Sequence, residues 1–283
     1  MLKSDEFQRW IEASHAMFEI FEGRYDVYPL AVRWAKEWLN LKKFNVSKED
    51  TEIVNHLIDS FNYDAYRNYK DKIEKNGNKW ANIVKRADQQ FKTLKNLKSG
   101  NWGNIGFGVA PFLFSWNFQR FKEYVKKKRN FDLQNYAEKL GKILEYRIKL
   151  LKEFSHKRLT HEEVAEEKVK KIFDDINSEL RKIGIGNNEP VGTIKLLHVF
   201  SPYYFPLIDN KIASVIGLSS LTSDSYVEWM KVVRRWLQRY YDLNENLEQK
   251  FHFSILKLMD QGLYIMSSVK LRARVENLGL KVN

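Results

Sequence analysis

The chain has 283 residues, with 48 Lys and Arg, 36 Asp and Glu, and no Cys. This length is enough for one large domain or two of ordinary size, and 43% hydrophobic residues can form a buried core, which excludes wholesale disorder. Without cysteine there is no disulfide scaffold, thiolate zinc site, iron–sulfur cluster or cysteine nucleophile.

The sequence shows neither a secretory signal nor a membrane-spanning segment. Met1 to Trp10 is charged, and the longest apolar stretch, around Val109 to Trp116, is far shorter than the roughly 18 residues that a spanning helix needs. Six His and no Cys leave few ligands for a transition metal. We therefore expect a soluble, cytoplasmic protein that binds no membrane, and the sequence indicates neither a metal nor another cofactor.

Helical periodicity dominates the first hundred residues. Ser4 is a candidate N-cap for a helix that ends at Gly23, Pro29 can open the next helix, and Ser47 to Asp50 resembles a capping box. Further helical patterns follow over 61–74 and 80–97.

Residues 99–108 contain four glycines and form the clearest predicted loop. No Gly-Lys-Ser/Thr follows, and no strand precedes, so this is neither a Walker loop nor a dinucleotide fingerprint. We expect a connection between helices, and we place a boundary here between an N-terminal helical region, 1–100, and a second helical region, 101–283. The two regions can also form one compact two-lobed unit.

Aromatic residues and then a basic run follow this loop. Most aromatics at this density belong to a core, but Trp116 and Arg120 are candidates for contacts with nucleic acid, together with Lys126, Lys127, Lys128 and Arg129.

The positive charge of the chain is concentrated in residues 67–130, which hold 16 Lys and Arg against four Asp and Glu. The net charge of this segment equals the net charge of the whole chain, +12. Such a local excess favours a polyanionic partner over solvated helix faces alone.

The C-terminal half is also predicted to be helical. A helix is expected over 131–154, and Thr160 to Glu163 resembles a capping box that starts another. Two later helices are expected over 226–240 and 247–270. Strand signals are short and scattered, so the predicted class is an all-α, multi-helix globular protein.

The most specific stretch runs from Leu180 to Leu218 and combines glycine turns, a short apolar helix and a Pro-aromatic loop. Gly184 and Gly186 follow one helix, and a second glycine turn is expected at Gly192, within the hairpin region 183–195. An apolar helix over 194–200 comes next. The loop Pro202-Tyr-Tyr-Phe-Pro206 then leads to Asp209 at the start of another helix.

This stretch of about forty residues resembles the helix-hairpin-helix DNA glycosylase superfamily. The resemblance places Gly184 and Gly186, or else Gly192, where the family has its hairpin glycines. Asp209 stands at the family's essential aspartate, and Lys195 lies near the Schiff-base lysine of bifunctional members. The spacing of the hairpin glycines is irregular. The number of residues between Lys195 and Asp209 is also smaller than the resemblance implies.

The resemblance implies DNA binding and removal of a damaged or mismatched base, with or without lyase activity. Glycine amides would bind phosphate, and a carboxylate at a helix start would stabilise positive charge on the sugar. Trp116, Tyr203, Tyr204 and Phe205 are candidate liners of a pocket for the extruded base.

Other interpretations stay open at this point. Asp209 can instead serve only as a helix cap. The chain can bind nucleic acid without catalysis, or it can be a helical scaffold for an acidic protein partner. The oligomeric state cannot be predicted from the sequence.

Overall fold

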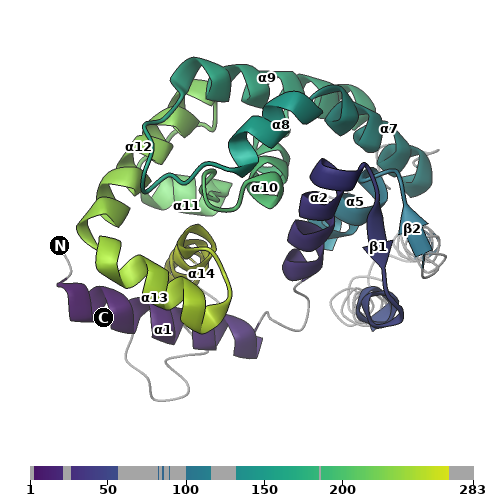
Figure 1. Cartoon of the computed structure of the whole chain (residues 1–283). Coiled ribbons are helices and arrows are strands. Elements are labelled where there is room, and N and C mark those ends of the chain that lie inside the picture. Colours follow the sequence, from purple (N-terminus) through teal and green to yellow (C-terminus); the bar gives the residue numbers. More distant parts are fainter. Residues whose placement is uncertain are drawn as a thin grey trace. The chain divides into compact units, whose positions relative to one another are not determined.

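The computed structural model describes residues 3–21, 27–56, 82, 85, 89, 100–115, 132–184 and 186–267, and the structural statements below concern these residues. Within them the structure is helical apart from one short two-stranded sheet (Figure 1). The elements in chain order are α1 (Ser4–Phe21), α2 (Tyr28–Leu41), β1 (Phe44–Val46), β2 (Gly100–Trp102), α5 (Gly106–Ser115), α7 (Leu133–Tyr146), α8 (Ile148–Ser155), α9 (Glu166–Ile183), α10 (Pro190–Phe200), α11 (Asn210–Val215), α12 (Ser223–Arg239), α13 (Tyr241–Phe251) and α14 (Ile255–Ser267). The all-α prediction is confirmed at this coarse level.

The chain divides into two units. The first comprises residues 1–24, 150–177 and 190–283, so it joins the N-terminal helix to the C-terminal helices. The second comprises residues 25–149 and 178–189. Helix α9 begins in the first unit, and its last residues belong to the second.

In the second unit, α5 packs against both α2 and α7. Pro29 stands in the first turn of α2, as predicted, and Ser47 and Asp50 exchange hydrogen bonds as a capping box. Strands β1 and β2 are antiparallel, with Phe44 opposite Trp102. Phe112 and Phe114 of α5 are fully buried, so these aromatic residues belong to the core.

Within the glycine-rich stretch 99–108, the described residues form a loop only at 103–105. Gly100 lies in β2, and Gly106 and Gly108 lie in α5. A β-carbon on Gly106 would collide with the carbonyl oxygen of Ala137, and one on Gly108 would lie 3.1 Å from the Trp34 ring. These two glycines therefore permit close packing of α5 rather than a change of chain direction.

The first unit is built from α1 and the C-terminal helices. Helix α14 packs against α1, α11 and α13. In the view of Figure 1, α11 lies inside the curve formed by α9, α12 and α13. A β-carbon on Gly262 of α14 would collide with the Trp10 ring of α1, so this glycine lets the two helices approach closely.

Three of the helices predicted in the C-terminal half differ from the structure. The described part of 131–154 forms two helices, α7 and α8, separated at Arg147. The described part of 247–270 is also divided, because His252 adopts a left-handed conformation (φ 58°) that ends α13. No helix starts at Thr160, since α9 begins only at Glu166.

The segment before α9 is held by tertiary hydrogen bonds instead of a capping box. The Tyr204 hydroxyl accepts from the Ala165 N–H (2.9 Å) and donates to the Glu163 carbonyl (3.3 Å). Arg234 Nε donates to the Glu162 carbonyl (2.8 Å). These contacts hold a non-helical path that the local sequence does not encode. Within the described ranges, no helix combines the length and the apolar character that crossing a bilayer requires.

Candidate functional site

The predicted hairpin lies between α9 and α10. The Gly184 N–H donates to the Leu180 carbonyl (2.8 Å), and the Gly186 N–H donates to the Arg181 carbonyl (3.2 Å). Gly186 has φ +84°, a conformation that favours glycine, and its carbonyl accepts from Arg181 Nε (2.9 Å). The chain therefore turns between two helices where the sequence predicts, and Gly184 and Gly186 shape this turn.

Gly192 does not form the second turn that the sequence analysis predicts. It lies in the first turn of α10, which starts at Pro190 and is buried along most of its length. Proline is favoured at this first helical position, so the helix begins four residues earlier than expected. The Gly192 N–H is one of the first four amides of the helix, which have no intrahelical acceptor.

Asp209 is held at the N-terminus of α11. Its Oδ1 accepts from the backbone N–H groups of Lys211 and Ile212, each at 2.8 Å, while its backbone is extended. The side chain is half-buried. Asp209 is thus the helix cap that one interpretation of the sequence expected, and the capping bonds fix the direction of its carboxylate.

The loop leading to Asp209 is anchored at two carbonyls. His198 Nδ1 contacts the Phe205 carbonyl (2.6 Å), and the Tyr226 hydroxyl donates to the Pro206 carbonyl (3.0 Å). Complete burial lowers the pKa of His198 to about 3, so the ring is neutral near pH 7 and Nδ1–H is the donor. These bonds connect α10 and α12 to the loop and thereby fix the start of α11.

Lys195 lies on α10, one helical turn before His198, and its side chain is 7% exposed. Residues three apart occupy the same face of a helix. The structure therefore places the lysine that the resemblance singles out on a buried stretch of α10.

A second pair of charged side chains is buried on α14. Nζ of Lys257 lies 3.5 Å from Oδ2 of Asp260 and 4.8 Å from the centre of the Phe18 ring of α1. The next residue, Gln261, is buried, and its Oε1 is 2.9 Å from Nδ1 of His15. Charged groups are rarely buried unless they are paired, and Lys257 and Asp260 are buried as such a pair.

The electrostatics connect the two predicted catalytic residues to this pair. Burial raises the pKa of Asp260 to about 6, the nearby charge of Lys257 lowers it, Asp209 raises it and Lys195 lowers it. Lys257 in turn contributes to the low pKa of His198. The charges of Asp209 and Lys195 therefore both influence the Asp260 carboxyl. We call Lys195, Asp209, Lys257 and Asp260 the charge cluster.

Two members of the charge cluster, Lys195 and Asp209, are predicted from the sequence as functional residues, and the other two are not. The apolar pattern over 247–270 predicts a helix, and α14 within it is buried along most of its length. The available signal was Lys257-x-x-Asp260 within that apolar pattern, a pair of opposite charges at the i,i+3 spacing of a single helix face.

Several predicted binding residues are not placed in this site. Trp116, Arg120, Lys126, Lys127, Lys128 and Arg129 lie outside the described residues. Tyr204 and Phe205 are fully buried and pack against Phe154, so they are core residues and not liners of a base pocket. Tyr203 remains accessible, with Arg158 above its ring at 4.5 Å.

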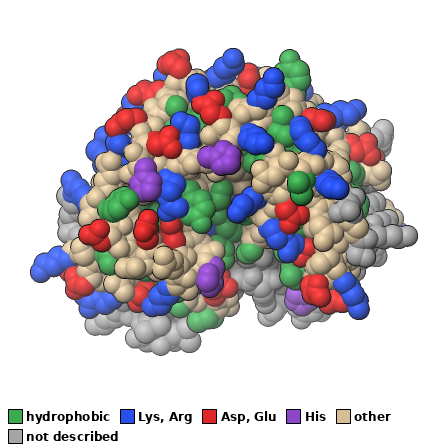
Figure 2. Space-filling view, viewed as in Figure 1, with side chains coloured by type: hydrophobic (Ala, Val, Ile, Leu, Met, Phe, Trp, Pro, Cys, Tyr) green, Lys and Arg blue, Asp and Glu red, His purple; other side chains and the backbone are tan. Residues whose placement is uncertain are grey.

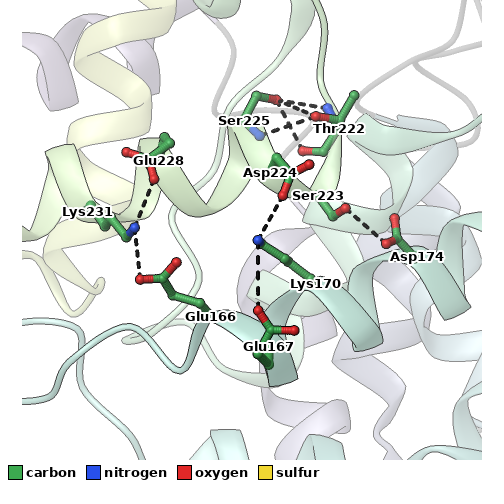
Figure 3. Close-up of polar contacts among 10 residues, drawn as sticks. All are labelled: Glu166, Glu167, Lys170, Asp174, Thr222, Ser223, Asp224, Ser225, Glu228 and Lys231. Carbon is green, nitrogen blue, oxygen red and sulfur yellow. Dashed lines mark hydrogen bonds and ion pairs between the residues drawn. The ribbon is translucent and has the colours of Figure 1, made fainter.

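The acidic residues near the start of α9 form ion pairs with α12. Lys231 bridges Glu166 and Glu228, both at 2.8 Å, and Lys170 contacts Asp224 at 2.9 Å (Figure 3). These pairs are at the surface and connect two helices of the same unit. In the described part of the chain, no three His, Asp or Glu side chains gather as potential metal ligands.

On the face shown in Figure 2, blue Lys and Arg side chains alternate with red Asp and Glu side chains among the described residues. This agrees with the sequence, in which the whole excess of positive charge falls within 67–130.

No family model matches the chain, and no curated protein or solved structure matches it either.

Proposed function

We propose that this chain binds DNA and removes a damaged or mismatched base by cleaving its N-glycosidic bond, as the resemblance to helix-hairpin-helix glycosylases implies. The observation that carries the proposal is the charge cluster. Lys195 and Asp209, chosen from the sequence as nucleophile and catalytic carboxylate, act on the same buried carboxyl, that of Asp260. The loop that separates the two residues in the sequence is anchored by hydrogen bonds at Phe205 and Pro206.

The order of elements supports the proposal. Helix α9, the turn at Gly184 and Gly186, helix α10, the Pro-aromatic loop and the cap Asp209 follow one another as the resemblance requires. Backbone N–H groups at the start of α10, including that of Gly192, suit a phosphate, because helix N-termini favour anions. The basic segment 67–130 would add affinity through contacts with the phosphate backbone.

The chemistry assigned to Asp209 is electrostatic. As the base departs, positive charge develops on the sugar, and a fixed carboxylate lowers the energy of that state. The two backbone N–H groups that bind Oδ1 prevent the side chain from turning away. Lys195 is the candidate nucleophile for C1′ of the sugar, as the resemblance implies.

The test is release of a base from duplex oligonucleotides under single-turnover conditions, with a panel of deaminated, alkylated, oxidised and mismatched bases. Asp209→Asn keeps a good N-cap but removes the charge, so we expect about a hundredfold loss of rate or more with an unchanged fold. Asp132→Asn is the matched control, because Asp132 also caps a helix, α7, through its side chain. We expect Asp132→Asn to release base at the wild-type rate.

Two results would contradict the proposal. Equal rates for wild-type protein and Asp209→Asn would remove the catalytic role of this carboxylate. Salt-sensitive binding of DNA without base release across the whole panel would instead support a non-catalytic nucleic-acid-binding protein.

A further inference from the structure

The end of α12 and the start of α13 carry basic and aromatic side chains but no acid. Residues 234–241 have the sequence Arg-Arg-Trp-Leu-Gln-Arg-Tyr-Tyr, and the nearest acids along the chain are Glu228 and Asp242. We call these eight residues the basic aromatic segment. Basic and aromatic side chains together are typical of surfaces that bind nucleic acid, and the charge cluster includes none of these residues.

Two aromatic side chains of the segment are exposed to solvent. Trp236 is 38% exposed and Tyr241 is 44% exposed. In the described ranges, the other aromatic residues with comparable exposure are Tyr146 and Tyr203. Aromatic rings usually contribute their large apolar surface to a core, so two exposed rings within six residues leave such surface available to a ligand.

The rest of the unit positions both exposed rings. The ring centre of Trp236 lies 6.0 Å from that of Trp229, with the two planes crossing at 83°, and Trp229 itself is buried. The Tyr241 hydroxyl lies 2.8 Å from Nε2 of His161. Rings that are already held in place lose little conformational freedom when a ligand stacks on them.

The three arginines of the segment differ in their contacts. Arg234 is engaged within the unit, because it donates to the Glu162 carbonyl and pairs with Glu163, each at 2.8 Å. Arg235 and Arg239 are exposed and form no ion pair with another described residue. These two residues are four apart, so they lie on the same face of α12.

The nearest acids along the chain have other interactions. Glu228 pairs with Lys231 at 2.8 Å, and this hydrogen bond, with a smaller contribution from the charge of Arg235, lowers the pKa of Glu228. Asp242 lies in the first turn of α13, where the helix N-terminus favours a carboxylate. The exposed face at the end of α12 is therefore locally positive.

From this arrangement we infer that the basic aromatic segment binds an unpaired strand of DNA. A base stacks on Trp236, Tyr241 offers a second ring, and Arg235 and Arg239 contact the phosphates. The inference rests on the proposed function only for the choice of DNA as the polyanion, and it does not require release of a base.

The chemistry of the segment favours a single strand over a duplex and over an acidic protein. In a duplex each base is stacked between its neighbours, whereas an unpaired base has a free face for an aromatic side chain. An acidic peptide would offer carboxylates to Arg235 and Arg239, but it would offer no planar ring to Trp236. A single strand matches both the charge and the exposed rings.

The first test measures binding of a labelled thymidine oligomer of about 15 nucleotides to the full-length protein by fluorescence anisotropy. Trp236→Leu keeps an apolar contact with Trp229 and removes the aromatic face, so binding should weaken at least about fivefold. Trp236→Phe should restore most of the affinity. Tyr146→Leu is the matched control, because it removes an aromatic ring of α7 that is 89% exposed, and it should bind like the wild type.

The second test uses salt dependence and leaves the packing of Trp236 unchanged. Arg235→Gln with Arg239→Gln should reduce the slope of log K against log salt by about 1.4, because each phosphate contact with a single strand contributes about 0.7. Lys149→Gln with Lys152→Gln is the matched control, since it removes two exposed positive charges. The slope of this control should equal that of the wild type.

A cross-link locates the strand on the protein. An oligomer that contains 5-iododeoxyuridine, irradiated in complex with the full-length protein, should become attached to Trp236 or Tyr241. Peptide mass spectrometry identifies the attached residue. Attachment exclusively outside the basic aromatic segment would overturn the inference.

The remaining outcomes separate this inference from the proposed function. Absence of binding by the wild type, or wild-type affinity and slope in both Trp236→Leu and the double arginine variant, would overturn the inference. A glutamate-rich peptide that displaces the oligomer as well as unlabelled DNA does would also overturn it and favour an acidic protein partner. Base release from duplex DNA is measured separately, so binding at this segment without base release would support the inference and contradict the proposed function.

Discussion

Nζ of Lys257 lies 3.5 Å from Oδ2 of Asp260, one turn along α14, and both side chains are buried. A buried ion pair usually costs more in desolvation than its attraction returns, so such a pair is weak evidence for stability. Because the charges of Lys195 and Asp209 also act on the Asp260 carboxyl, we propose that the pair belongs to the functional site.

Asp260 should make the folded protein less stable as the pH rises from about 4 to about 6. Its pKa is raised from 3.8 to about 6 in the folded state, so between these values the folded chain retains a proton that the unfolded chain has lost. The free energy of unfolding, relative to that of Asp260→Asn, should fall by about 3 kcal/mol across this range and stay constant above it. Urea unfolding at a series of pH values measures this difference, and a flat difference would show that the folded carboxyl titrates normally.

His198 should make the folded protein less stable as the pH falls, whereas Asp260 does so as the pH rises. Its folded pKa of about 3 lies below the ordinary 6.5, so on acidification the unfolded chain gains a proton first. Relative to His198→Asn, the wild-type protein should lose up to about 1.4 kcal/mol of stability per pH unit below 6.5. Replacement of the exposed His156 by Asn is the control, and its unfolding curves should follow the wild type. Parallel curves for His198→Asn and wild-type protein would contradict the assignment of a neutral, buried ring.

Gly106→Ala should destabilise the second unit. The added methyl group would collide with the backbone carbonyl of Ala137 and lie 2.7 Å from the Gly141 nitrogen, so α5 and α7 would have to separate. We expect a loss of about 2 kcal/mol or more in the free energy of unfolding. Gly103→Ala is the matched control, since nothing lies within 4 Å of its new methyl group. Equal stability of the two variants would show that the contact between α5 and α7 is looser than described.

The basic run at 126–129 should carry part of the affinity for DNA. Changing Lys126, Lys127, Lys128 and Arg129 to Gln should weaken binding to any duplex and reduce the slope of log K against log salt by up to about 3.6. The control changes four exposed lysines of α7 and α8, namely Lys139, Lys142, Lys149 and Lys152. Fluorescence anisotropy at several salt concentrations measures both slopes. Equal slopes would show that net charge, and not this run, determines the binding.

Local sequence signals predicted the structure where the element depends on its own residues. Pro29 opens α2, Ser47 and Asp50 form a capping box, and Asp209 caps α11, each through bonds within a few residues. Sequence patterns did not predict the local structure where contacts with residues far along the chain determine it. Gly106 leaves room for the close approach of Ala137, and Tyr204 and Arg234 bind the backbone of the non-helical segment before Glu166.

The candidate site was partly predictable for the same reason. Lys195 and Asp209 belong to one contiguous stretch, so a motif can contain both. Lys257 and Asp260 come from a helix about fifty residues later, and only packing of α14 against α11 brings them to that site. A single sequence does not encode that packing in any local pattern.

The most direct test of the central claim is to identify the residue that carries the sugar after borohydride trapping on abasic DNA. Nuclease treatment, proteolysis and mass spectrometry of the trapped full-length protein locate the modified side chain. The account predicts that the reduced sugar is attached to Nζ of Lys195. Attachment to a lysine outside the charge cluster, or to the α-amino group of Met1, would contradict it.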